Sequence, residues 1–168
     1  MKRWALRSGL VLAGALLSAN HLHSALQDEE AEVKACFESF QAALKAKDPG
    51  KIWKLLDADS RDAAERAAKA IKAAYAKASA EKKAAWEKAL GLPGAELTKL
   101  TGEGYLKTKR FLGKYDEVPE SKIDKIDVKA DKATVHYIEA DGDKEKFYLR
   151  LEGKVWKLSV PIPAVGKP

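Results

Sequence analysis

The chain has 168 residues, with 31 lysines and arginines against 25 aspartates and glutamates, and a formal net charge of +6. Its single cysteine excludes an intramolecular disulfide. The length is that of one domain, and neither an internal repeat nor a linker rich in proline, glycine or serine divides it.

The first 25 residues have the three parts of a secretory signal peptide. Three basic residues precede an uncharged, mostly apolar segment at 9–19, and small residues offer cleavage after Ala19 or after Ala25. This segment is shorter than the roughly 20 residues of a membrane-spanning helix, which favours cleavage over an uncleaved anchor. We therefore predict a signal peptide at 1–25, one domain at 26–162, a flexible tail at 163–168, and a protein exported to the periplasm or secreted.

Removal of the signal peptide changes what the composition implies. Three of the basic residues fall within 1–25, so the exported domain keeps 28 basic and 25 acidic residues, a net charge of about +3. Such a balance gives no special affinity for nucleic acid. Of the three histidines only His136 lies clear of the signal region, and together with Cys36 it makes too few ligands for a zinc site. We predict no metal, no cofactor, no nucleic-acid partner and no membrane span after cleavage.

The front half of the domain is predicted to be helical. Between residues 27 and 47, apolar residues recur at helical spacing and form one stripe, in which Cys36 is expected to pack as a core residue. Asp48 followed by Pro49 is typical of the start of a second helix, because aspartate caps a helix and proline suits its first position.

A third and a fourth helix are expected next. Either Asp59 or Ser60 is the expected cap of the third helix, and Ser79 is the expected cap of the fourth. Gly91 is expected to end the fourth helix, since glycine adopts the left-handed conformation that terminates helices. The passage from 95 to 113 is interpreted as helical or rich in turns.

From residue 121 the apolar residues alternate with a period of two, which is typical of β-strands. Turns are expected at Asp131-Lys132, at Asp141-Gly142 and near Gly153. The predicted fold is therefore α+β, with N-terminal helices packed on one face of a curved four-stranded antiparallel meander. The four strands are expected at 121–130, 133–140, 144–152 and 154–160.

The register of the strands follows from keeping the apolar side chains on one face, because a slip of one residue would turn them outward. A three-residue loop with a left-handed Gly142 sets Val135 opposite Phe147. Two-residue turns in the outer hairpins pair Val128 with Val135, Ile126 with Tyr137, Leu149 with Trp156, and Phe147 with Leu158. The apolar inner face then consists of Ile126, Val128, Val135, Tyr137, Phe147, Leu149, Leu151, Trp156, Leu158 and Val160.

One pattern in the helical half carries a resemblance to a known family. It consists of Phe37, Phe40, Ala43, Leu44, Asp48, Ile52, Trp53, Leu55, Leu56, Ser60 and Arg61. With a curled meander behind it, this pattern resembles the nuclear transport factor 2-like (cystatin-like) superfamily over residues 29–160. The resemblance implies a cone of helices and sheet whose wide mouth is a ligand pocket. It implies no activity, since this fold carries enzymes, binding proteins and assembly modules alike.

The sequence offers little for catalysis. His136 has the strand parity of the outer face, so the inner face lacks a histidine base for a serine or cysteine nucleophile. Tyr137 is the one polar tip that the sheet is expected to direct inward, and no acidic residue is expected at an inward strand position. Asp57 and Asp59 are interpreted as turn and cap residues. A non-catalytic role is favoured, with an acid–base isomerase, hydratase or cyclase in the same cone as the alternative.

Two surfaces are candidates for binding. An open cone would be a pocket for a small apolar or amphipathic ligand, and a filled cone would make the same rings a core. The outer face of the sheet suits an interface with an envelope partner or a homodimer, or is a solvated face. The pocket candidates are Trp53, Tyr75, Tyr105, Tyr137 and Trp156, and the interface candidates are His136, Ile138, Tyr148 and Arg150.

Overall fold

The computed structural model of the protein describes residues 16–166, with side chains from residue 27 onward. The basic start of the predicted signal peptide, and most of its apolar segment, lie outside the described residues. The first helix begins at Leu16 rather than near residue 27, so both predicted cleavage points fall within a helix. Among the helices described, none has the length and apolar character needed to cross a membrane.

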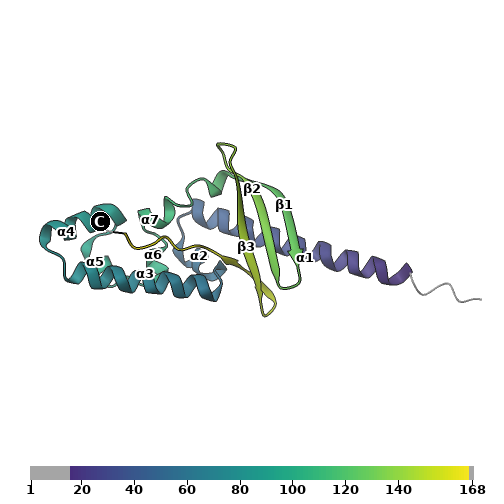
Figure 1. Ribbon diagram of the computed structural model, residues 1–168, viewed down its shortest axis with the longest axis horizontal. Helices are drawn as coiled ribbons and strands as arrows, with labels where there is room; N and C mark the ends of the chain where they lie inside the picture. The colour runs from purple at the N-terminus through teal and green to yellow at the C-terminus, as the bar shows by residue number, and fades with distance from the viewer. Residues whose placement is uncertain (1–15, 167–168) are drawn as a thin grey trace, which may run out of the picture.

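The structure is α+β, as the sequence predicts, with the helices first and the strands last. Figure 1 shows α1 crossing beside the sheet and continuing past β1, with the other helices grouped towards the opposite end of the molecule. The helical elements are α1 (Leu16–Lys45), α2 (Pro49–Leu55), α3 (Ala58–Ala76), α4 (Ala80–Leu90), α5 (Gly94–Leu97), α6 (Gly102–Tyr105), α7 (Lys109–Leu112) and the short 3₁₀ helix η1 (Val118–Glu120).

Three of the expected helix boundaries are confirmed. The carboxylate of Asp48 accepts a hydrogen bond from the backbone N–H of Lys51 at 3.0 Å and caps α2. Ser79 caps α4, and Gly91 ends it with a left-handed φ of 69°. Each of these signals is local, because the capping side chain or the glycine acts on backbone groups of its own turn.

The expected cap of α3 is wrong. Asp57, not Asp59 or Ser60, caps this helix, and its carboxylate accepts a hydrogen bond from the Ser60 N–H at 2.8 Å. The backbone N–H of Asp57 also donates to the Leu158 carbonyl at 2.9 Å. This contact with a distant strand fixes where the helix begins, and a local pattern does not contain it.

The sheet is the predicted meander, with strand order β1-β2-β3-β4 and antiparallel pairing throughout. The middle hairpin has the predicted register, with Val135 opposite Phe147 and Gly142 at a φ of 97° in the connecting loop. The strands are β1 (Lys122–Lys129), β2 (Lys132–Ile138), β3 (Lys144–Glu152) and β4 (Val155–Ser159).

The predicted registers of the two outer hairpins are wrong by two residues. Val128 pairs with Ala133 rather than Val135, and Leu149 pairs with Leu158 rather than Trp156. The first turn is Ala130-Asp131 rather than Asp131-Lys132, and the last is Gly153-Lys154, one residue later than the predicted pairing requires. Ala130 and Gly153 each have a positive φ. A bulge in β1 further sets Ile123, not Ile126, opposite Tyr137. A shift of two residues keeps every side chain on its expected face, since the period of a strand is two.

The core lies between α1, the short helices and the inner face of the sheet. Phe37 and Phe40 of α1 contact Phe147 with ring centroids 5.6 and 5.3 Å apart. Burial of such rings is the main stabilising contribution in a domain of this size. The inner-face prediction is confirmed, because Val135, Tyr137, Phe147, Leu149, Trp156, Leu158 and Val160 are buried, and Ile126, Val128 and Leu151 are partly buried.

The segment after β4 returns over the helical half of the molecule (Figure 1). The Tyr105 hydroxyl donates to the carbonyl of Pro163 at 3.0 Å, and Arg110 donates to the carbonyl of Ala164 at 3.4 Å. The sequence predicts a flexible tail at 163–168, and residues 163–166 of it lie along α6 and α7.

Candidate functional site

The structure does not bring the five aromatic pocket candidates together. Tyr105 is fully buried, and Trp53 packs at the margin of the core. Tyr75 lies beside α4, where its hydroxyl donates to Glu87 at 2.5 Å. Trp156 is buried against α1, and its indole N–H has no hydrogen-bond partner among the described residues. Tyr137 and Trp156 line two separate hollows, one at the hairpin that joins β2 and β3 and one between α1 and β4.

Cys36 lies next to Trp156 and is buried, as predicted. Its thiol donates to the Trp156 carbonyl at 3.3 Å. Burial raises the pKa of Cys36 to about 11, so the thiol stays protonated at neutral pH. A protonated and buried thiol contributes packing rather than nucleophilic chemistry.

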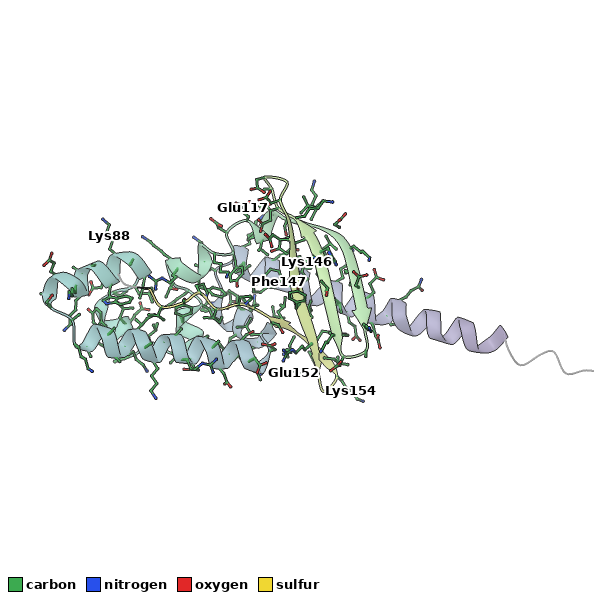
Figure 2. All side chains as sticks on the ribbon, in the orientation of Figure 1. Lys88, Glu117, Lys146, Phe147, Glu152 and Lys154 are labelled. Atoms are coloured by element: carbon green, nitrogen blue, oxygen red, sulfur yellow. The ribbon has the colours of Figure 1, made fainter. Side chains whose placement is uncertain are left out.

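The hollow beside Tyr137 has a volume of about 390 Å³. It lies at the end of the sheet where β2 and β3 are joined, facing the segment that follows α7. Figure 2 labels Lys146 and Phe147 on β3, and Glu117 near the same hairpin. Its lining consists of Lys114, Tyr115, Tyr137, Glu139, Glu145, Lys146, Phe147 and Pro161.

Two further hollows are not lined by the inner face of the sheet. One of about 720 Å³ lies between α3, α4 and the C-terminal segment, and one of about 420 Å³ lies beside α7 and the end of α1. Neither includes a side chain from the inner face of the sheet. The hollow at the hairpin end is lined by three aromatic rings, those of Tyr115, Tyr137 and Phe147, together with two carboxylates from the sheet and its hairpin.

The floor of this hollow is aromatic. The ring centroid of Phe147 lies 5.5 Å from that of Tyr137 and 5.8 Å from that of Tyr115. Tyr115 is held in place because its hydroxyl donates to the Pro161 carbonyl. The hydroxyl of Tyr137 makes no hydrogen bond with any described residue, although the side chain is only 5 % exposed. Its oxygen is not among the buried polar atoms that lack a partner, so the small exposed part of Tyr137 includes the hydroxyl, which is open to the hollow.

The rim of the hollow is acidic. Glu139 and Glu145 lie beside Tyr137 and raise the pKa of its hydroxyl, after the larger effect of burial. Burial is also the largest cause of the raised pKa of Glu139, followed by the neighbouring charge of Glu117. None of these three glutamates forms an ion pair with a described residue. The rim therefore presents carboxylates with no cationic partner within 4.0 Å among the described residues, although Lys114 and Lys146 line the same hollow.

Three of these acidic groups lie close enough to share one cation. Ligand oxygens of Glu117, Glu139 and Asp141 all lie within 4.8 Å of one another. The charge of Asp141 is the largest cause of the raised pKa of Glu117. Such crowding of exposed carboxylates occurs in proteins without a bound metal, so the proximity alone assigns no metal site.

Basic side chains also reach this hollow. The Lys114 ammonium lies 5.7 Å from the ring centroid of Tyr115, a distance at which the π-face of the ring attracts a cation. Lys146 lines the rim from the outer face of β3. The geometry thus already holds one ammonium group over an aromatic ring of the floor.

The acidic part of the site differs from the sequence prediction. No acidic residue is expected at an inward strand position, and this is wrong for Glu145 of β3, while Glu139 lies one residue past the end of β2. Glu139 follows Tyr137 by two residues and Glu145 precedes Phe147 by two, so strand parity alone places both on the inner side. Tyr115 carries no comparable signal, because it lies in an irregular segment between α7 and η1.

The remaining acidic candidates serve the fold. Asp57 is 1 % exposed, and its carboxylate accepts hydrogen bonds from the Ser60 N–H and from the Ser159 hydroxyl. Asp59 is exposed and pairs with Arg150 at 2.7 Å. Asp57 is therefore the cap of α3, and Asp59, one of the two expected caps, forms an ion pair at the outer surface.

The interface candidates lie on the outer face of the sheet, as expected from parity. His136 is within 3.0 Å of the Asp127 carboxylate, and Tyr148 is 55 % exposed. Ile138 is partly buried between Lys122 and Lys144 of the neighbouring strands.

No protein-family model matches the chain, and comparison with curated proteins and with solved structures gives no significant match.

Proposed function

We propose that this protein is an exported, non-catalytic binding domain that takes a small amphipathic organic cation in the hollow beside Tyr137. The observation that carries the proposal is the unpartnered hydroxyl of Tyr137, which opens into the hollow between an aromatic floor and the unpaired carboxylates of Glu139 and Glu145. A ligand in the hollow can donate a hydrogen bond to this hydroxyl, which has no partner among the described residues.

The nuclear transport factor 2-like fold is part of this proposal. Helices that precede a curved antiparallel sheet support it, and so does the position of the hollow at one end of the inner face. In such a cone the hollow corresponds to the mouth. The wide interior is occupied by the rings of Phe37, Phe40 and Phe147, so only the mouth offers room for a ligand.

A positively charged ligand fits the electrostatics of the hollow better than a neutral apolar one. The crowded carboxylates at the rim raise one another's pKa, and a bound cation would relieve this repulsion. A cation over a tyrosine or phenylalanine ring gains about 0.5–2 kcal/mol. The apolar part of the ligand would lie on the rings of Tyr115 and Phe147.

The alternative of acid–base catalysis in the same place has weaker support. Glu139 has a raised pKa, as a general acid requires, but it is only partly buried, and Glu145 is exposed. These positions suit attraction of a charge at the rim more than proton transfer inside a closed site.

The proposal is tested by titrating the full chain with benzylammonium in a calorimeter. We expect saturable binding, and no binding of phenylacetate, which carries a similar ring with the opposite charge. The double substitution Glu139→Gln with Glu145→Gln should weaken binding roughly tenfold, because each carboxylate at a partly exposed site contributes about 0.5–1 kcal/mol.

A matched control removes an acidic group elsewhere. Asp62→Asn changes an exposed carboxylate on α3 and should leave the affinity unchanged. Equal weakening by Asp62→Asn and by the rim substitutions would show that only the overall charge matters. Equal binding of phenylacetate would also contradict the proposal.

A further inference from the structure

The outer face of the sheet is densely basic, although the chain as a whole is nearly balanced. Residues directly opposite one another in neighbouring strands share a face, so the register identifies the outer side chains. Eight of them are cationic and two, Asp127 and Glu152, are acidic. The cationic residues are Lys122, Lys125, Lys129, Lys132, Lys144, Lys146, Arg150 and Lys157.

Four of these cations form one row across the whole sheet. Lys129 lies opposite Lys132, Lys132 opposite Arg150, and Arg150 opposite Lys157. Like charges directly opposite one another destabilise a sheet. Asp59 compensates Arg150, whereas no described acid lies within 4.0 Å of Lys129 or Lys132.

The other end of the face is also incompletely neutralised. Lys125 pairs with Asp127 at 2.6 Å, but Lys122 and Lys146 form no ion pair with a described residue. Exposed side chains of Tyr148 and Val155, each 55 % accessible, add an aromatic and an aliphatic contact surface to the same face. The uncompensated charge therefore extends over the length and the width of the sheet.

We propose that this outer face docks on the surface of an anionic lipid membrane. Charge complementarity carries the proposal. The lysines that face one another across the strands repel and so destabilise the sheet, and the anionic headgroups of a membrane would reduce this repulsion. The cations spread in two dimensions, as the phosphates of a bilayer surface do. Tyr148 between the two basic ends suits the interface between headgroups and acyl chains, where tyrosine is enriched.

Two other occupants fit the face less well. A second copy of the chain would set one basic face against another, and like charges across an interface oppose association. Single-stranded nucleic acid is usually bound by several exposed rings that stack with bases, and this face offers one exposed aromatic side chain, Tyr148. Seven of the eight cations are lysines, which act as point charges rather than as bidentate readers of a base.

The test is co-sedimentation of the full chain with vesicles of phosphatidylcholine containing 30 mol % phosphatidylglycerol, and with vesicles of phosphatidylcholine alone. We expect binding to the anionic vesicles that falls steeply as salt increases. The double substitution Lys129→Gln with Lys132→Gln should reduce the partition coefficient about tenfold or more. All variants keep the same N-terminal segment, so its contribution to membrane binding cancels.

The matched control substitutes two lysines away from the sheet. Lys69→Gln with Lys88→Gln removes the same charge from exposed positions on α3 and α4, and Figure 2 labels Lys88 far from the hairpins. This control should bind the vesicles nearly as well as the unaltered chain. Because it relieves repulsion within the sheet, the Lys129 and Lys132 variant should unfold at a higher temperature than the unaltered chain, which separates loss of docking from loss of folding.

Four results would overturn the proposal. They are equal binding to both kinds of vesicle, an equal loss in the α3 and α4 control, a dimer in solution that the Lys129 and Lys132 substitutions dissociate, and preferential binding of a single-stranded oligonucleotide over the anionic vesicles.

Discussion

The carboxylate of Asp57 joins two distant parts of the chain. It caps α3 through the Ser60 N–H and accepts a hydrogen bond from the hydroxyl of Ser159 on β4. The backbone of the same residue pairs with Leu158. One side chain thus fixes both the start of a helix and the position of the last strand.

We predict that Asp57→Ala destabilises the fold by about 1–3 kcal/mol, because it removes a helix cap and leaves the Ser159 hydroxyl without its partner. Chemical denaturation followed by circular dichroism measures this. Asp59→Ala is the control, since Asp59 forms only an exposed ion pair and should cost less than about 1 kcal/mol. An equal cost for both substitutions would contradict the assignment of Asp57 as the cap.

The carboxylate of Glu139, unlike that of Asp57, lies in surroundings that disfavour its charged form. Its pKa is raised by burial first and then by nearby acidic groups. Because the pKa of Glu139 is higher in the folded than in the unfolded state, the protonated carboxyl group stabilises the folded protein at low pH. This contribution is lost as the pH rises through the folded-state pKa. At neutral pH the ionised group is therefore a destabilising feature of the folded protein.

We predict that Glu139→Gln raises the unfolding temperature at pH 7 and changes it much less at pH 4, where the glutamate is largely protonated. Thermal unfolding at the two pH values measures the difference. An increase of the same size at both would show that amide packing, not removal of charge, stabilises the variant.

Among the secondary-structure elements, three helix boundaries set by local capping residues were predicted correctly, whereas the registers of the two outer hairpins were not. Asp48, Ser79 and Gly91 act within one turn of their own helices, so the sequence alone identifies them. The outer hairpins depend on which residue takes a positive φ, and one of these is Ala130, a residue type that rarely does so. Turn composition therefore gave the wrong position there, while the faces of the strands remained correct.

The candidate site divides in the same way. The alternation of side chains along β2 and β3 predicts that Glu145, and Glu139 just after β2, lie on the inner side, although no acidic residue was expected there. The contribution of Tyr115 depends on the path of the chain between α7 and η1, which no periodicity describes. Tyr75, Tyr105 and Trp156 lie apart because each ring packs against a different set of elements in the core.

At the scale of the whole molecule, net charge conceals a strong separation of charge. The outer face of the sheet gathers eight cations, while the loop between β2 and β3 and the residues after α7 gather unpaired acids. A net charge of +6 for the chain, or about +3 without residues 1–25, gives no indication of this. The separation becomes evident only once the register shows which side chains share a face.

Binding of an organic cation in the hollow beside Tyr137 is tested most directly by titrating the isotope-labelled protein with benzylammonium and following it by nuclear magnetic resonance. We expect the backbone amide shifts to concentrate at residues 114–117 and 137–147, and Glu139→Gln with Glu145→Gln to require roughly tenfold more ligand for the same shifts. Shifts concentrated between α3 and α4, or an equal response to phenylacetate, would contradict binding in this hollow.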